Sequence, residues 1–159
     1  MQDVLIKKYN EKGEGVAQTD HGPLIVPFAL VGERVQVTPS SQGQYATIEA
    51  ILDASPHRQS PPCPSFGVCG GCQLQHMSPD AYADFKIKLV AEAFQAQGLD
   101  GVSFGPLVPI PTHSRRRINV RVHHTGTDIH VGFHRRRSHE VVDVERCLLL
   151  DPKIEQLLA

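Results

Sequence analysis

CPSFGVCGGCQLQH, residues 63–76, sets the organisation of this chain, because it places three of the four cysteines within ten residues. The fourth, Cys147, lies far along the sequence. In a reducing compartment four cysteines in this arrangement favour metal or redox chemistry over structural disulfides. The stretch therefore predicts a loop that closes around a bound metal and separates an N-terminal region from a C-terminal one.

The region before this loop, residues 1–53, is predicted to form five short strands. They are VLIKKY, VAQT, LIVPF, RVQVT and YATIEAIL, separated by turn sequences. Within RVQVT, Val35 and Val37 alternate with polar residues, the period of a strand with one buried face. Pro27 is placed at a strand end because it cannot donate to a ladder. Five such runs favour a small β-barrel of the OB type.

The proline-rich segment DASPHRQSPP, residues 53–62, is typical of a boundary. We therefore predict a barrel domain at residues 1–54, a linker at 55–62 and an α+β domain at 63–159. The fold class is mostly β with an α+β second part.

Helix and strand signals alternate after the cysteine loop. Ser78 and Pro79 predict the start of a helix that runs to about Gln97, with Gly98 beyond its end. From Arg115 the period returns to two, which predicts a hairpin turning at TGTD, then a strand in EVVDVERC and a helix opening at Asp151. The apolar residues expected to face a core are Tyr82, Phe85, Leu89 and Ala93 on the helix, and Ile118, Val120, Val122, Ile129, Val131 and Phe133 on the hairpin.

The predicted metal ligands are Cys63, Cys69, Cys72 and Cys147. Structural zinc sites usually pair two short C-x2-C knuckles, whereas three close cysteines with one remote partner are more typical of an iron–sulfur cluster. Zinc, and a redox pair at Cys69 and Cys72, remain open as alternatives. His76 is interpreted as a capping or packing residue.

The charge distribution is uneven although the formal net charge is only −1. Residues 1–53 carry four Lys/Arg against seven Asp/Glu, whereas residues 112–139 carry seven arginines and one acid. A polyanion is therefore expected to bind the second region, chiefly through its phosphates, with a solvated charged face as the alternative. The predicted RNA-binding residues are Arg115, Arg116, Arg117, Asn119, Arg121, Arg135, Arg136 and Arg137.

Several function classes find no support in the sequence. The N-terminus has no apolar signal region, and the longest apolar run, GPLIVPFALVG, is too short to span a bilayer. We therefore expect a cytoplasmic protein without a membrane partner. No glycine loop for a phosphate or dinucleotide is present, and no catalytic residue is predicted.

Five segments carry a resemblance to a known family: GEGVA at 13–17, VPFALVGERV at 26–35, SPHR at 55–58, the cysteine stretch at 63–76 and VGFHRRRSHEVVDVERCLLLDP at 131–152. They resemble the N-terminal part of the bacterial RNA 5-methyluridine methyltransferases, specifically the 23S rRNA uracil-C5 enzymes with a TRAM domain. The resemblance implies a TRAM domain at the N-terminus, a [4Fe-4S] cluster on the four cysteines, and RNA, here 23S rRNA, as the partner.

The resemblance also implies that catalysis belongs to a further, Rossmann-like domain that binds S-adenosylmethionine and supplies a nucleophilic cysteine. All four cysteines here are assigned to the cluster, so this chain is expected to recognise RNA and not to methylate it alone. S-adenosylmethionine is expected only in the full-length enzyme, with the methyltransferase domain in the same or an adjacent chain. The alternative is a free-standing RNA-binding iron–sulfur or zinc module.

Overall fold

The structure is a computed structural model that describes residues 1–41 and 43–158. The chain divides into two compact units, each composed of two segments. The first unit comprises Met1–Ser60 and His76–Leu107, and the second comprises Pro61–Gln75 and the residues from Val108 onward. These units do not contain the same residues as the predicted domains, because residues 76–107 belong to the same unit as the N-terminal strands. The predicted division at residues 55–62 stays a prediction.

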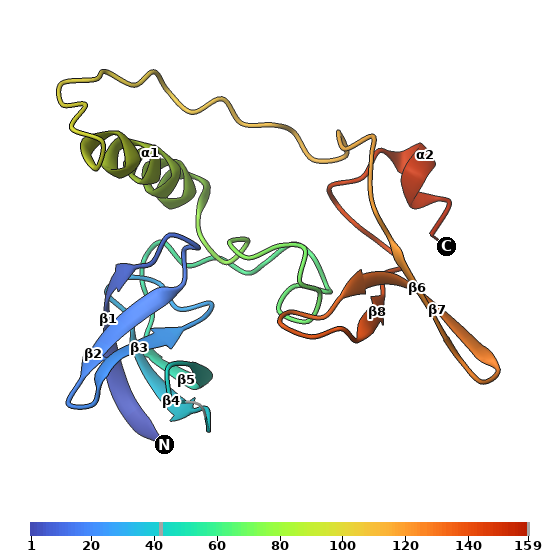
Figure 1. The fold of residues 1–159 in the computed structure, drawn as a ribbon, viewed down its shortest axis with the longest axis horizontal. Coiled ribbons are helices and arrows are strands. Elements are labelled where there is room, and N and C mark those ends of the chain that lie inside the picture. The colour runs from blue at the N-terminus through green and yellow to red at the C-terminus, as the bar shows by residue number, and fades with distance from the viewer. Residues whose placement is uncertain (42, 159) are drawn as a thin grey trace. The chain divides into compact units, whose positions relative to one another are not determined.

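The first unit holds an antiparallel sheet in the order β3-β2-β1-β4-β5, drawn from blue to cyan in Figure 1. The five predicted strands are confirmed. They are β1 (Gln2–Tyr9), β2 (Gly15–Thr19), β3 (Gly22–Val26), β4 (Arg34–Pro39) and β5 (Ala46–Asp53).

The sheet is not a closed barrel, which corrects the predicted architecture. Ile25 on the edge strand β3 forms a single parallel bridge with Tyr45, and its amide donates to the Gln44 carbonyl at 2.9 Å. Along a strand, the amides that donate to the same neighbouring strand lie two residues apart. After Ile25 the next such position is Pro27, which has no N–H to donate. Pro27 follows the end of β3, as predicted, and limits this contact to one bridge.

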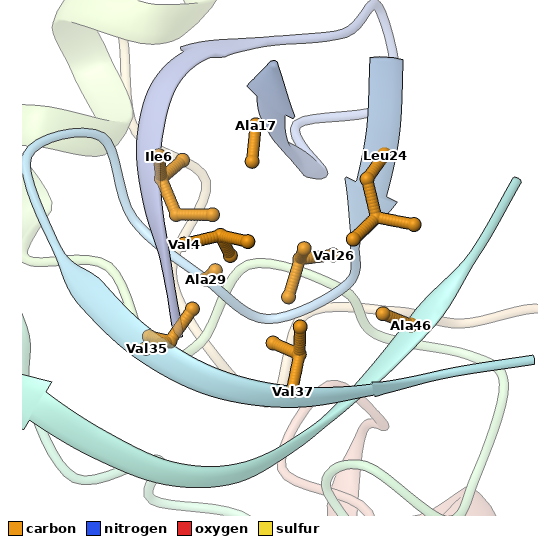
Figure 2. Packing of buried hydrophobic residues seen from close by; sticks show 9 residues of the cluster. All are labelled: Val4, Ile6, Ala17, Leu24, Val26, Ala29, Val35, Val37 and Ala46. Atoms are coloured by element: carbon orange, nitrogen blue, oxygen red, sulfur yellow. The ribbon is translucent and has the colours of Figure 1, made fainter. Parts of the chain in front are cut away.

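The core of the first unit lies on the concave side of this sheet, where Figure 2 shows its side chains converging from different strands. Val35 and Val37 are fully buried and alternate with the partly exposed Gln36, which confirms the predicted period of two. A Cβ on Gly15 would lie 2.8 Å from Ile6 Cγ2, so β1 and β2 approach closely here. The cluster comprises Val4, Ile6, Ala17, Leu24, Val26, Ala29, Val35, Val37 and Ala46.

One buried ion pair joins the sheet to the segment after it. Glu33 is fully buried, and its carboxylate accepts hydrogen bonds from Arg58 Nε and Nη2, both at 2.6 Å. The amides of Leu30 and Ser55 donate to the same carboxylate at 2.7 and 3.1 Å. Burial alone would raise the pKa of Glu33, but these hydrogen bonds together hold that pKa below its ordinary value.

A short antiparallel pairing, here termed the stem, encloses the cysteine loop. In the stem residues 57–59 pair with residues 76–78: the Gln59 amide donates to the His76 carbonyl at 2.9 Å and the Ser78 amide to the His57 carbonyl at 2.8 Å. His76 is 1% exposed and its ring packs edge-on against Phe28 at 5.9 Å. The interpretation of His76 as a packing residue agrees with this position.

Helix α1 (Pro79–Gln95) begins where the sequence predicts, with Ser78 accepting from the Ala81 amide at 3.4 Å. It ends two residues before the predicted Gln97, since short-range bonds such as Gly98 N to Gln95 O tighten the chain there. Phe85 is buried and its ring lies 5.4 Å from that of Tyr9. Tyr82 and Ala93 are exposed, so the expectation that both face a core is wrong.

The second unit contains a three-stranded sheet in the order β6-β7-β8 and a short helix. Its elements are β6 (Arg121–Thr125), β7 (Asp128–His134), β8 (Val141–Asp143) and α2 (Pro152–Glu155). Val122 pairs with Val131 and Thr125 with Asp128, which confirms the hairpin and its turn. Asp151 caps α2 as predicted, accepting from the Lys153 amide at 2.9 Å.

Two details of this sheet differ from prediction. The strand expected from Arg115 begins only at Arg121, so Ile118 and Val120 lie outside it. Val122 and Ile129 are 67% and 65% exposed, and the expectation that they face a core is wrong. A sheet of three strands, one of them three residues long, has too little surface of its own to cover them. None of the helices in the described part of the chain has the length and apolar character to cross a membrane.

Candidate metal centre and nucleic-acid interface

All four cysteines lie in the second unit as free, half-buried thiols. Turns within residues 63–72 fold the loop back on itself: the Phe66 amide donates to the Cys63 carbonyl at 3.1 Å and the Cys69 amide to the Ser65 carbonyl at 2.9 Å. The Cys63 amide donates to Gln75 Oε1 at 3.2 Å. The loop is therefore shaped by its own backbone, with three thiols on one short segment.

The fourth thiol is held beside helix α2. The Cys147 amide donates to Glu155 Oε1 at 2.8 Å, and the Leu150 amide donates to the Cys147 carbonyl at 3.1 Å. Leu150 is fully buried, which anchors this turn in the second unit. The remote cysteine is thus fixed by contacts that the spacing alone did not reveal.

The thiols influence one another electrostatically. Burial raises the pKa of Cys72, and negative charge on Cys147, Cys63 and Cys69 raises it further. Burial also raises the pKa of Cys69, where the Gly71 amide donates to Sγ at 3.4 Å and opposes the effect. At Cys69 and Cys72 the protein alone therefore favours the neutral thiol, and a bound cation would have to displace the proton there.

The donor set fits a single ion and a cluster to different degrees. Within residues 1–41 and 43–158, no three or more His, Cys, Asp or Glu side chains converge closely enough to hold one metal ion. A cuboidal cluster places its own iron and sulfide atoms between the cysteines, so its ligands are more widely spaced than those of a tetrahedral zinc ion. The thiols of Cys69 and Cys72 each interact with those of Cys63 and Cys147, and an amide lies beside one sulfur, so these donors fit the cluster in chemistry.

The cysteine loop docks by its backbone on the connection between β7 and β8, residues 135–140, here termed the arginine turn. The Gly70 amide donates to the His134 carbonyl at 2.9 Å, and the Arg136 amide donates to the Val68 carbonyl at 3.3 Å. Cys69 and Arg135 form an antiparallel bridge between them. The predicted ligand loop and one predicted arginine triplet are therefore direct neighbours.

Within the arginine turn, Arg135 is engaged by Glu140. Its Nε and Nη2 donate to the two carboxylate oxygens at 2.8 and 3.0 Å, and the two backbones also pair. The hydrogen bond from Arg135 lowers the pKa of Glu140. Arg135 is therefore already paired with a carboxylate in the folded turn, and Arg136 and Arg137 follow it in the sequence.

The other predicted arginine triplet lies on a different neighbour. The Arg115 amide donates to the Leu149 carbonyl at 2.9 Å, and the Arg115 carbonyl accepts from the Asp151 amide at 3.0 Å. Arg116, Arg117 and Asn119 are exposed in the extended segment before β6. Arg121 is exposed on β6, where it pairs with Gly132. The common RNA-binding face remains a prediction.

Sequence reasoning missed one polar pair on this sheet. His130 Nδ1 lies 2.7 Å from Asp143 Oδ2, and the Val131 amide donates to Asp143 Oδ1 at 2.8 Å. The hydrogen bond to Asp143 raises the pKa of His130 and lowers that of Asp143. The separation of thirteen positions between them offers no signal, because the pairing depends on the register of β8 against β7.

Comparison with known proteins identifies relatives across almost the whole chain, although no family model matches. An RNA methyltransferase of Brucella suis is 39% identical over 151 residues, which cover 95% of this chain and 36% of that protein. The 23S rRNA (uracil(1939)-C(5))-methyltransferase of Alkalilimnicola ehrlichii is 33% identical over 165 residues, covering 98% of this chain and 37% of that protein.

Among solved structures, the Pyrococcus abyssi tRNA (uracil-54, C5)-methyltransferase in complex with S-adenosyl-L-homocysteine matches 98% of this chain and 35% of its own. The TM-score is 0.60 and the sequence identity is 25%. Sequence and structure comparisons thus agree on the same kind of enzyme and on a similar share of its length. The chain is homologous to RNA methyltransferases and spans about a third of the length of the relatives that it matches.

Proposed function

We propose that this chain is the RNA-recognition portion of an S-adenosylmethionine-dependent RNA uracil-C5 methyltransferase. The observation that carries the proposal is similarity along 98% of the chain both to an enzyme named for 23S rRNA and to one named for tRNA. The two enzymes are named for different RNAs but for the same atom of uracil. Methyl transfer itself is assigned to the part of the relatives that this chain does not span. For this protein 23S rRNA is the proposed RNA.

Within this portion, residues 1–54 are proposed as a TRAM domain of OB type and residues 63–159 as a central RNA-binding domain, joined by residues 55–62. The antiparallel five-stranded sheet, with a single bridge between Ile25 and Tyr45, supports the first assignment. The domain boundaries follow the sequence, and the stem accounts for the close association of residues 76–107 with the N-terminal sheet. The reduced thiols suit the cytoplasm, where we place the protein.

Cys63, Cys69, Cys72 and Cys147 are proposed to hold a [4Fe-4S] cluster. When bound, such a cluster would join the cysteine loop to the turn before α2 through metal–sulfur bonds. The free thiols, their mutual influence and their common location in one unit support this role. Each thiol would lose its proton when the cluster binds. Because the pKa of Cys69 and that of Cys72 are raised, both thiols keep their protons more readily in the metal-free protein.

The proposed enzymatic role is tested by incubating the purified chain with 23S rRNA fragments and labelled S-adenosylmethionine. We expect RNA binding without methyl transfer. Adding the remaining portion of a full-length relative as a separate chain provides the control for competent RNA and cofactor. Methylation by this chain alone would refute the assignment of catalysis to another part of the enzyme.

Removing the arginines before β6 is expected to weaken RNA binding and reduce its salt dependence. Replacing Arg115, Arg116 and Arg117 together by alanine should lower the slope of log affinity against log salt by about 2, at about 0.7 for each phosphate contact to single-stranded RNA. Binding is measured by fluorescence anisotropy across a salt series. Replacing Lys7, Lys8 and Lys12 removes the same charge from the acidic region and should change the slope little. Equal slopes for the arginine variant and the unsubstituted chain would assign these arginines to a solvated face.

Anaerobic purification is expected to yield iron and inorganic sulfide in the equal amounts that a [4Fe-4S] cluster contains. The Cys147→Ser variant should lose most of both, because it removes the ligand that links the cysteine loop to the turn before α2. Metal and sulfide analysis with visible absorption measures the outcome. Zinc without sulfide in the unsubstituted chain would contradict the cluster and favour a structural zinc site.

A further inference from the structure

We propose that Gly70 couples the cysteine site to the arginine turn, so that occupancy of the cysteine site controls how strongly Arg136 and Arg137 bind RNA. Gly70 is therefore a positioning residue. The proposal rests on the proposed function, because it assumes that the arginine turn contacts RNA. It adds that binding or loss of the metal at the cysteines would change the affinity of the chain for RNA.

The contact leaves no space for a side chain at position 70. A Cβ there would lie 2.9 Å from the His134 carbonyl oxygen and 3.3 Å from Arg136 Cα and N. All three atoms belong to the backbone and cannot move aside alone. The same close approach brings the Gly70 amide to the His134 carbonyl at 2.9 Å. A larger residue would push the cysteine loop and the arginine turn apart.

The turn also depends on its surroundings for its shape. Arg137 has a φ of +55°, a conformation that costs energy in a residue with a side chain. The neighbouring Arg136 amide is fixed by the Val68 carbonyl of the cysteine loop at 3.3 Å. Displacing the loop would therefore remove a contact adjacent to the strained residue and change how both arginines are presented.

The loop in turn requires its metal. Residues 61–75 contain no helix or strand longer than isolated bridges, and none of them is fully buried. The hydrogen bonds within the loop and the two to residues 134–136 each contribute about 1 kcal/mol, and together they fall short of the conformational entropy lost in ordering about ten residues. Metal–sulfur bonds at three positions of the loop supply the missing constraint, as in small domains that fold only with metal. Loss of the metal would therefore release the loop and, through Gly70, the arginine turn.

The test compares RNA affinity and its salt slope for four samples of the full chain: loaded, stripped of iron by a chelator, and the loaded Gly70→Ala and Gly105→Ala variants. Stripping and Gly70→Ala should each weaken binding about tenfold and lower the slope by about 1 to 2, the loss of one or two phosphate contacts. Gly105→Ala is the matched control, since it makes the same substitution outside the cysteine loop and its Cβ would meet nothing within 4 Å. It should bind RNA like the unsubstituted chain.

Iron and sulfide are quantified in each sample, and Gly70→Ala is expected to retain both, because its Cβ meets backbone atoms and not sulfur. Undiminished RNA affinity in a metal-loaded Gly70→Ala variant would overturn the proposal. If the Gly70→Ala variant loses its metal, the test is the comparison between the stripped and the loaded unsubstituted chain. Equal RNA affinity of these two samples overturns the proposal. Failure of the loaded, unsubstituted chain to bind RNA would instead refute the proposed function.

Discussion

Replacing Glu33 with alanine is expected to lower the free energy of unfolding of the first unit by about 3–5 kcal/mol, as for other buried ion pairs that lose one partner. The substitution leaves the Arg58 guanidinium, whose side chain is 20% exposed, without its carboxylate. It also removes the acceptor for the Leu30 and Ser55 amides. Chemical denaturation followed by far-ultraviolet circular dichroism measures the loss.

The matched control is Asp53→Ala, which breaks the ion pair between Arg34 Nε and Asp53 Oδ2 at 2.7 Å. Both side chains there are more than half exposed, so we expect a change of about 1 kcal/mol or less. Equal losses in the two variants would show that the Glu33 pair contributes no more than a surface pair.

The stabilisation from Glu33 is also expected to depend on pH. Its folded-state pKa lies below the unfolded value, so its contribution is complete above the unfolded pKa of about 4.3 and is lost as the pH falls through the folded value. The difference in stability between the unsubstituted chain and Glu33→Gln should therefore shrink on acidification below pH about 4. A difference that stays constant to lower pH would contradict a charged Glu33 in the folded protein.

Replacing Gly132 with alanine is expected to destabilise the second unit by about 3 kcal/mol or more, at the upper end of the range for overpacked sites. A Cβ at this position would overlap the Val142 carbonyl oxygen, lie 2.9 Å from its carbon and 3.2 Å from Asp143 Cα. All three atoms belong to β8, so the strand must move away from β7. The His130 contact with Asp143 should be lost with it, visible as a fall in the pKa of His130 by NMR.

Gly105→Ala serves as the control for this prediction, since a Cβ at Gly105 would meet nothing within 4 Å. We expect it to change the unfolding free energy by about 0.5 kcal/mol or less, as for other surface substitutions. An unchanged pKa of His130 and unchanged stability in Gly132→Ala would show that β8 accommodates the methyl group without leaving β7.

The strands of the first unit are predictable from sequence because their signals are local. Alternation at Val35 and Val37, and the absence of an N–H at Pro27, act within a few residues and do not depend on the rest of the fold. The same holds for Ser78 and Asp151, which cap the following helices through amides two or three residues away.

The remaining features depend on contacts between distant segments. Arg135 lies in a basic stretch of the sequence, but in the folded turn its guanidinium donates hydrogen bonds to the Glu140 carboxylate. Closure of the first sheet could not be judged from strand count, since it depends on whether β3 and β5 meet along their length or at one bridge. The exposed Val122 shows that a period of two predicts a strand without predicting what, if anything, covers its apolar face.

The stem gives the cysteine loop a particular place in the architecture of the chain. Because Gln59 and His76 are hydrogen-bonded, the segment between them leaves and re-enters the N-terminal unit at neighbouring points. This segment is an insertion in the topology of the first unit. None of the five strands of the first sheet lies within it, so a change in its length or sequence leaves every strand pairing of that sheet unchanged. An insertion or deletion within residues 60–75 would therefore leave the hydrophobic core of the first sheet in place, because no residue of that core lies in this segment.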